Sequence, residues 1–292
     1  MKILVTGKNG QLGRSINDLI KNHIYIDNSN YSHDFTFVGR SELDLNSETN
    51  ISNYFKKNAF DIIINCAAFT AVNKAEKHKA LANQINHLAV KKLANIAKIQ
   101  KAKLLHISTD YVFDGENDRP YSEVDPTNPI NIYGKTKLAG EQAIQEIMPT
   151  DSTIIRTSWV YSKYGNNFVN NILRLAKDRS EINIVSDQIG SPTYAPDLAN
   201  LIFRLINKNE FMDTYKSQLF HYSNDGEISW YEFAKEIIKI AKVDCKVSPI
   251  TTVDYKDTTN RPKNTLMSKE KIINKFNINI KCWRTSLGKC IS

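Results

Sequence analysis

The sequence lacks any long apolar run. No stretch approaches the roughly 20 uninterrupted apolar residues that a membrane-spanning helix needs. The first residues also lack the basic region, apolar region and small-residue cleavage site of a secretory signal. We therefore expect a cytoplasmic protein with no membrane partner. A chain of 292 residues can bury a large core, in one large domain or in two joined ones.

Cysteine and clustered positive charge are also scarce. The four cysteines, Cys66, Cys245, Cys282 and Cys290, are too widely spaced for a paired-ligand zinc pattern, and we expect them to be reduced thiols. The formal net charge is +8, but Lys and Arg are scattered and no nucleic-acid reading motif is recognisable. We therefore expect no nucleic-acid partner, although a positive field can favour a phosphorylated small substrate.

Short apolar runs alternate with longer amphipathic stretches through the first half of the chain, which is typical of βαβ units. Strands are expected at 2–6, 35–38, 61–65, 103–108 and 152–156, and helices at 11–21, 47–57, 76–100 and 132–147. Residues 114–131 hold three prolines and are expected to form a long loop. The pattern predicts an α/β fold with a Rossmann-type doubly wound parallel sheet, whose ligands lie at the C-terminal strand ends.

The regular alternation fades after about residue 157. We expect a nucleotide-binding Rossmann domain over residues 1–157, with a returning segment near 192–217. A smaller, interleaved substrate-binding domain is expected from residues 158–191 and 218–292.

Three glycines follow the first expected strand at three-residue intervals. Gly7 permits a tight turn, Gly10 lets backbone amides approach a pyrophosphate, and Gly13 lets the helix pack closely on the sheet. The helix N-terminus supplies partial positive charge for the pyrophosphate. The spacing indicates a dinucleotide cradle, and a turn whose glycines serve packing alone stays open as the alternative.

Tyr133 and Lys137 are four residues apart, so both project from one face of the helix expected there. A nearby ammonium favours the phenolate and lowers the pKa of the tyrosine, and the lysine can also hold a ribose hydroxyl. Such spacing is also common on ordinary helix surfaces. The pair gains weight from Ser108, Thr109 and Asp110, which end an expected strand at the same edge of the sheet. Thr109 and Asp110 can meet a substrate there, or simply cap a turn.

These residues resemble the extended short-chain dehydrogenase/reductases and, within them, the dTDP-4-dehydrorhamnose reductase family. The resemblance runs nearly end to end through blocks in the family's order: Thr6 to Gly13, Asn65 to Glu76, Ser108 to Phe113, Tyr133 to Glu141, Arg156 to Tyr161, Asp187 to Thr193, and Arg261 with Pro262.

The resemblance implies hydride transfer from a reduced nicotinamide to C4 of dTDP-6-deoxy-L-lyxo-4-hexulose (dTDP-4-dehydro-6-deoxy-L-mannose), which gives dTDP-L-rhamnose. Tyr133 would be the proton donor, and Lys137 would bind the nicotinamide ribose and lower the pKa of the tyrosine. Thr109 and Asp110 would contact the sugar, with Thr109 tuning proton transfer, and Trp159 would lie against the hexose.

The predicted cofactor contacts combine the glycine motif with positions that the family uses: Gly7, Gly10, Gln11, Leu12, Gly13, Arg40, Asp44, Leu45, Ala68, Phe69, Thr70, Ile107, Tyr133 and Lys137. Gly39 and Arg40 follow the second strand, where an acidic residue would bind a ribose diol and repel a phosphate. Arg40 can pair with a 2′-phosphate, so we expect NADPH, with NADH as the alternative.

Departures from the family concern contacts and a metal. Phe69 and Asn73 stand where relatives often carry other residues, which alters contacts near the nicotinamide but removes no proton donor. Relatives that bind a divalent metal use glutamates, and the aligned Ser15 and Pro196 cannot replace them, so we expect no metal. A monomer and a homodimer both fit the sequence.

Two alternatives remain open at this stage. The substrate can be another nucleotide-linked 4-keto-6-deoxy sugar, because the motifs near the nicotinamide do not distinguish such sugars. The chain can also be a non-catalytic, NADP-binding regulatory subunit, although such a protein has no need of Tyr133, Lys137, Thr109 and Asp110.

Overall fold

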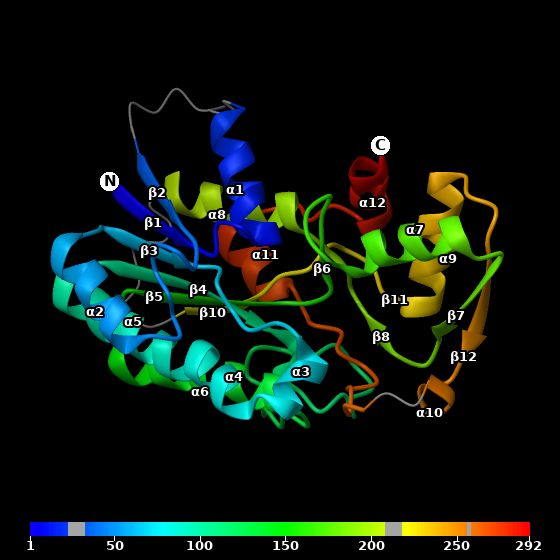
Figure 1. Ribbon diagram of the computed structural model, residues 1–292, viewed down its shortest axis with the longest axis horizontal. Helices are drawn as coiled ribbons and strands as arrows, with labels where there is room; N and C mark the ends of the chain where they lie inside the picture. The colour runs from blue at the N-terminus through cyan, green and yellow to red at the C-terminus, as the bar shows by residue number, and fades with distance from the viewer. Residues whose placement is uncertain (23–32, 208–217, 256–257) are drawn as a thin grey trace.

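The computed structural model describes residues 1–22, 33–207, 218–255 and 258–292, and a parallel sheet forms its centre (Figure 1). Six strands of the described chain pair in the order β10-β5-β4-β3-β1-β2. Their bounds in chain order are β1 Lys2–Thr6, β2 Asp34–Val38, β3 Ile62–Asn65, β4 Lys103–Thr109, β5 Ser152–Thr157 and β10 Gln218–His221. All pairs are parallel. The strand order reverses between β1 and β3, which places the expected ligand crevice beside their carboxyl ends.

Both faces of the sheet are apolar, because successive side chains of each strand point to opposite sides. In β1, Ile3 and Val5 join one core and Leu4 joins the other. Figure 1 shows the covering helices on the two sides of the sheet. One face carries α1 (Gln11–Lys21), α8 (Ala195–Asn207) and α11 (Glu270–Phe276), and the opposite face carries α2 (Glu48–Lys57), α5 (Ala89–Gln100) and α6 (Ile132–Ile147).

A smaller region, on the right in Figure 1, surrounds a separate core that includes Phe233 and Trp283. Its helices are α7 (Phe168–Asp178), α9 (Trp230–Ala241), α10 (Thr252–Tyr255) and α12 (Trp283–Ile291). Its short strands pair two by two: β6 (Val160–Tyr161) with β9 (Thr193–Tyr194), β7 (Glu181–Val185) with β12 (Lys246–Ile250), and β8 (Ile189–Gly190) with β11 (Ile228–Ser229).

The predicted strands and most predicted helices are confirmed to within one residue at each end. The prediction of one helix over 76–100 is wrong. That stretch belongs to α3 (Val72–Lys77), α4 (Lys79–Asn83), the π-helical turn η1 (Gln84–Leu88) and α5. The chain leaves helical geometry at His78, with φ −119° and ψ 50°, and one wide turn then shifts the helical phase at η1.

Residues 114–131 form no helix or strand, as predicted, and follow the 3₁₀ turn η2 (Asp110–Val112). None of the helices among the described residues is long and apolar enough to cross a membrane.

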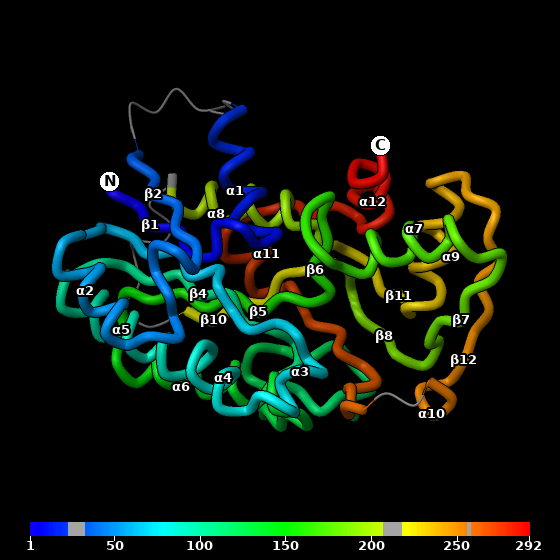
Figure 2. The backbone as a smooth tube through the Cα atoms, viewed as in Figure 1, coloured from blue at the N-terminus to red at the C-terminus, as the bar shows by residue number. Residues whose placement is uncertain are grey.

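The predicted domain limits stay a prediction, but two elements after residue 217 differ from them. β10 pairs with β5 in the large sheet, and α11 contributes Ile272 and Phe276 to the core beneath that sheet. In Figure 2 the chain approaching α11 returns from the smaller region to the large sheet. The smaller region is therefore interleaved with the sheet more deeply than the sequence predicted.

A buried ion pair fixes α6 on the sheet. The Arg156 guanidinium of β5 donates to the Glu141 carboxylate of α6, with Nη2 and Oε2 2.7 Å apart, and both side chains are at most 4% exposed. Arg156 also lies over the ring of Phe113, 5.1 Å from its centroid. The charges of α6 and β5 therefore compensate each other inside the protein, where an unpaired charge is costly.

Replacing Glu141 with Gln leaves the buried Arg156 without its counterion, which costs about 3–5 kcal/mol. We expect urea denaturation to show a free energy of unfolding lower by that amount in Glu141→Gln. The matched control is Glu48→Gln, because Glu48 is 74% exposed in its ion pair with Lys92 and should lose below about 1 kcal/mol. Equal losses in the two variants would contradict this account.

Candidate active site

The glycine turn after β1 has the geometry of an anion cradle. Gly7 has φ +73°, and the Gly10 amide donates to the Gly7 carbonyl at 2.9 Å. Gly10 is the N-cap of α1, and no side chain caps the first amides of that helix. These amides are therefore available to a phosphate. The tight turn at Gly7 is confirmed. A Cβ on Gly13 would lie 2.3 Å from the Gly7 oxygen, so the lack of a side chain there lets α1 pack closely on the turn that follows β1.

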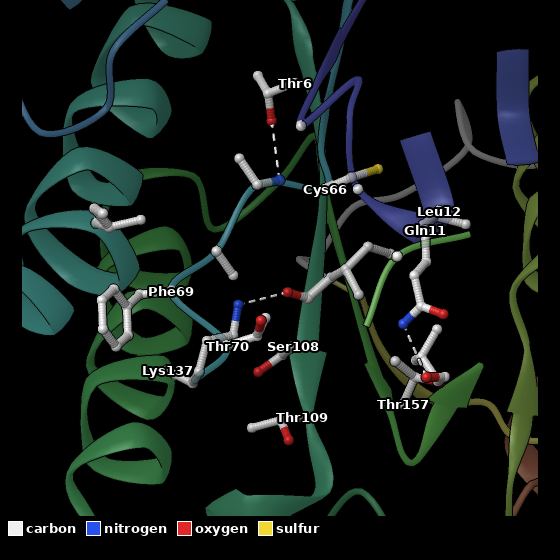
Figure 3. Close-up of a pocket in the computed structure, with 18 of the residues that line it drawn as sticks. Thr6, Gln11, Leu12, Cys66, Phe69, Thr70, Ser108, Thr109, Lys137 and Thr157 are labelled. Atoms are coloured by element: carbon white, nitrogen blue, oxygen red, sulfur yellow. Dashed lines mark hydrogen bonds between the residues drawn. The ribbon is translucent and has the colours of Figure 1, made fainter. Parts of the chain in front are cut away.

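A cavity of about 810 Å³ opens at the carboxyl ends of the strands, beside this turn (Figure 3). It brings together every predicted site residue except Gly13: Gly7, Gly10, Gln11, Leu12, Arg40, Asp44, Leu45, Ala68, Phe69, Thr70, Ile107, Thr109, Asp110, Tyr133, Lys137 and Trp159. Gly13 does not line the cavity but packs against the backbone of the turn at Gly7 and Lys8. Residues from β4, α1, α6, the loops after β1, β2 and β3, and the smaller region thus share one space.

Lys137 reaches the cavity from α6, whose N-cap Asn131 accepts the Gly134 amide at 2.8 Å. Its side chain is only 1% exposed. The Nζ atom donates to the carbonyl of Ile107 at 2.6 Å and lies 3.1 Å from His106 Nε2. Burial lowers the pKa of Lys137 to about 8, and the negative charge of Glu141 opposes that shift. The amine is therefore held in place by β4.

A row of polar side chains continues from Lys137 across the sheet. Thr6, Asn65 and His106 are register partners on β1, β3 and β4. The Thr6 hydroxyl donates to Asn65 Oδ1 at 2.7 Å, and Asn65 Nδ2 lies 3.0 Å from His106 Nδ1. Burial and the charge of Lys137 hold the pKa of His106 well below its usual range. The row links the lysine to the strand that leads into the glycine turn.

Tyr133 lies one helical turn before Lys137, but the predicted electrostatic effect of the lysine is wrong. Burial raises the pKa of the Tyr133 phenol; the charges of Asp110 and Tyr111 add to the rise, and a hydrogen bond with Thr109 opposes it. The Lys137 amine makes its hydrogen bonds with Ile107 and His106 instead. The phenol is therefore protonated at neutral pH, as a proton donor must be.

Thr109 and Asp110 stand where β4 ends. The Thr109 hydroxyl donates to Asp110 Oδ1 at 2.9 Å and accepts the amide of Tyr111. Asp110 is 2% exposed, and its Oδ2 atom has no hydrogen-bond partner among the described residues. Burial raises the pKa of Asp110 to about 6, against hydrogen bonds that lower it. A buried, unpartnered carboxylate oxygen beside a cavity is suited to accept a ligand hydroxyl.

The cations near the end of β2 are paired with carboxylates. Arg40 Nε lies 3.5 Å from Asp44 Oδ1, and the Arg40 side chain is 72% exposed. Lys8 Nζ lies 2.6 Å from Glu42 Oε1, and this hydrogen bond lowers the pKa of Glu42 to about 2. The sequence analysis missed Lys8, whose side chain lies beside Gly39. A ligand phosphate at this end of the cavity would compete with two carboxylates for the cations.

Trp159 forms the opposite wall together with a residue that the sequence analysis missed. Its ring stacks on that of Trp230, with centroids 3.4 Å apart and planes at 10°. Trp159 has φ +48°, and a Cβ on Gly190 would lie 2.7 Å from its ring. The Trp pair therefore has a fixed orientation at the cavity edge.

Comparison with known proteins identifies the family of this site. The family described as "RmlD substrate binding domain" matches residues 1–292. A dTDP-4-dehydrorhamnose reductase of Aggregatibacter actinomycetemcomitans is 37% identical over 292 residues, covering 98% of this chain and 97% of the relative. The chain belongs to the dTDP-4-dehydrorhamnose reductase family.

One solved structure and one further relative extend this comparison. A crystal structure of dTDP-4-dehydrorhamnose reductase from Bacillus anthracis in complex with NADP has a TM-score of 0.89 and 37% identity, covering 99% of this chain and 98% of that chain. A dTDP-4-keto-6-deoxy-D-glucose reductase of Streptomyces niveus is 33% identical, covering 97% of this chain and 94% of the relative. The predicted resemblance and fold class are confirmed.

In this dTDP-4-dehydrorhamnose reductase family member, Asn86 supports the site from the π-helical turn η1. Its Oδ1 accepts the Phe69 amide at 2.8 Å, and its Nδ2 donates to the Phe69 carbonyl at 3.1 Å and to Thr136 Oγ1 at 3.2 Å. Asn86 therefore joins the loop after β3 to the helix of Tyr133. The sequence did show a polar residue, Asn86, inside the expected helix. The direction of its side chain could not be predicted, because the π-helical turn shifts the helical phase there.

The raised pKa of Asp110 predicts a pH-dependent effect of Asp110→Asn. In the folded protein the protonated acid is favoured, so its stabilising contribution is present at low pH and is lost as the pH rises through about 6. Relative to the unaltered protein, we expect the variant's free energy of unfolding to rise by roughly 2 kcal/mol between about pH 4.5 and about pH 7.5. Urea denaturation at both pH values measures the difference, and a pH-independent difference would contradict the prediction.

Proposed function

We propose that this chain is an NADPH-dependent oxidoreductase that reduces the C4 keto group of dTDP-4-dehydro-6-deoxy-L-mannose to give dTDP-L-rhamnose, the last step of dTDP-rhamnose synthesis. The observation that carries the proposal is the convergence of Tyr133, Lys137, Thr109 and Asp110 on the cavity that begins at the glycine turn. Family membership supports the choice of sugar nucleotide.

The described residues fit a dinucleotide. The turn at Gly7 and the uncapped start of α1 offer backbone amides to a pyrophosphate, and Gly13 leaves no room there for a side chain. Arg40 and Lys8 can approach a 2′-phosphate once they leave their carboxylate partners. The NADP complex of the Bacillus anthracis relative supports NADPH, and NADH remains the alternative cofactor.

The reduced nicotinamide supplies the hydride for C4. Tyr133 would donate its phenolic proton to the oxygen of C4 as negative charge develops there. The alkoxide is the stronger base, so the transfer is favourable even from a phenol with a raised pKa. Thr109 would accept or donate a hydrogen bond beside that oxygen and so tune the transfer.

Lys137 and Asp110 would orient the reactants. Lys137 is charged below a pKa of about 8 and would hold the nicotinamide ribose from its fixed place at Ile107. The free Oδ2 of Asp110 would accept a sugar hydroxyl. Phe69, Trp159 and Trp230 line the cavity with apolar surface, which limits water at the reacting atoms.

A different 4-keto sugar is the nearest alternative, because the Streptomyces niveus relative carries the name of a reductase for dTDP-4-keto-6-deoxy-D-glucose. The specificity for one such sugar over another would depend on the wall formed by Trp159 and Trp230 rather than on the proton donor. A non-catalytic regulatory subunit is less well supported, since the four polar groups of the predicted reaction are all present in the cavity.

The direct test is a panel of dTDP- and UDP-linked 4-keto sugars with NADPH and NADH, read as loss of reduced-cofactor absorbance. We expect the highest kcat/KM with dTDP-6-deoxy-L-lyxo-4-hexulose and NADPH. Tyr133→Phe should lower kcat by at least about 100-fold while the sugar and NADPH dissociation constants stay within about twofold, because only the proton donor is lost.

NADPH binding without turnover of any sugar in the panel would favour the regulatory alternative. Turnover limited to another keto sugar would change the substrate and keep the reaction. Near-normal turnover by Tyr133→Phe would remove Tyr133 as the donor.

Arg40→Ala tests the choice of cofactor. Loss of a charged hydrogen bond is worth about 1.5–3 kcal/mol, so we expect kcat/KM for NADPH to fall by about 10- to 100-fold and that for NADH to change little. Arg179→Ala is the control, because Arg179 is exposed and does not line the cavity. An equal effect on both cofactors would mean that Arg40 does not contact the 2′-phosphate.

A further inference from the structure

The side chain of Gln11 is engaged away from the dinucleotide position. Its Nε2 donates to the Val160 carbonyl at 3.0 Å, the hydrogen bond drawn in Figure 3. Its Oε1 accepts from Ser162 Oγ at 3.0 Å and from Asn167 Nδ2 at 2.9 Å. An amide oxygen has two lone pairs, so both are in use. Gln11 therefore offers a ligand its backbone amide and little of its side chain.

Other residues of α1 bind the same segment, residues 160–167. The Tyr164 hydroxyl donates to Asp18, and Lys163 Nζ lies 3.6 Å from Asp18 Oδ2. Arg14 lies 5.2 Å from the centre of the Tyr164 ring. Positions 11, 14 and 18 share one face of a helix. Segment 160–167 is thus docked along the helix that opens at the glycine turn.

Segment 160–167 directly follows Trp159 and helps to form the wall of the cavity. Val160, Gly165 and Asn167 line the cavity alongside Trp159. Because Trp159 stacks on Trp230, a displacement of Val160 would move the stacked pair. The contacts of Gln11 therefore connect the cofactor turn to the aromatic wall, across 149 residues of sequence at the Val160 bond.

We propose that Gln11 is a positioning residue that fixes the Trp159 wall relative to the glycine turn, and that its side chain is not a ligand of the dinucleotide. The inference rests on the proposed function only in assigning the sugar to that wall. Loss of the Gln11 amide then weakens sugar binding and leaves NADPH binding intact, because the phosphate contacts of the turn come from backbone amides.

The test compares Gln11→Leu, which keeps side-chain volume and removes all three hydrogen bonds, with Ser162→Ala. Ser162 does not line the cavity, and its Oγ also bonds the amide and the carbonyl of Tyr164, so Ser162→Ala loosens segment 160–167 as well as its bond to Gln11. We expect KM for the sugar to rise about tenfold in Gln11→Leu and about threefold in Ser162→Ala, from about 0.5–1.5 kcal/mol for each hydrogen bond. The NADPH dissociation constant should stay within about twofold. The double variant should be no worse than Gln11→Leu, because both changes break one network.

A second readout does not depend on activity. The chain has three tryptophans, so 5-fluorotryptophan labelling gives three ¹⁹F resonances. In Gln11→Leu and in Ser162→Ala, we expect the resonances of Trp159 and Trp230 to shift or broaden. The resonance of Trp283 should shift less than these two, because segment 160–167 reaches its carbonyl, through Tyr161, while its ring lies buried in the core of the smaller region. It serves as the internal control for folding.

A tenfold rise in the NADPH dissociation constant of Gln11→Leu, with unchanged Trp159 and Trp230 resonances, would overturn the proposal and make Gln11 a cofactor ligand. Unchanged resonances and unchanged KM in both variants would overturn it as well. If the unaltered protein turns over no keto sugar, the proposed function fails, and the fluorine spectra still decide the role of Gln11.

Discussion

The hydrogen bond from the buried amine of Lys137 to the carbonyl of Ile107 is the contact on which the site depends. An amine taken out of water must find acceptors inside the protein, or it loses its proton. β4 provides the carbonyl oxygen of Ile107 as one acceptor, and Nε2 of His106, also in β4, lies 3.1 Å from the amine. Because α6 and β4 are held together at this point, Tyr133 on α6 and Thr109 on β4 lie against the same cavity. One turn further along α6, Glu141 repeats the arrangement with Arg156 of β5.

Burial acts on the two functional groups of α6 in opposite directions. It raises the pKa of the Tyr133 phenol and lowers that of the Lys137 amine, so both groups move toward their uncharged forms. The sequence spacing suggested that the lysine charge would dominate, but in the folded protein desolvation is the larger effect and the amine is directed to the sheet. The same low-polarity surroundings strengthen each hydrogen bond made to a developing oxyanion. Under the proposed function, such a site would favour proton donation from Tyr133 as charge develops on the substrate, rather than a phenolate formed beforehand.

Local patterns in the sequence were enough to predict the sheet, the glycine turn, the Tyr133 and Lys137 pair and the polar end of β4. Each of these depends on residues within about one helical turn or one strand. The features that were missed depend on long-range pairing or on backbone phase. Trp230 meets Trp159 only after the smaller region folds, and Asn86 points at Phe69 only because η1 adds a wide turn. The place of β10 in the large sheet was missed for the same reason, since its partner β5 lies about sixty residues earlier and nothing local marks the return.

Gln11 shows how one motif position can serve two structures. Its backbone belongs to the first turn of α1, where the amides face the cavity, while its side chain leaves that cavity for segment 160–167. A motif read along the sequence records only the first of these tasks, because the partners of the amide are about 150 residues away. Since α1 is packed on the sheet by Leu12, Ile16 and Leu19, it presents a rigid face to the smaller region through positions 11, 14 and 18. The sheet therefore sets the position of the glycine turn and, through the same helix, that of the aromatic wall. A hydride donor and its acceptor must be held within about 0.5 Å of the reactive geometry, and a shared helix is a direct physical means of keeping the two halves of such a cavity in register.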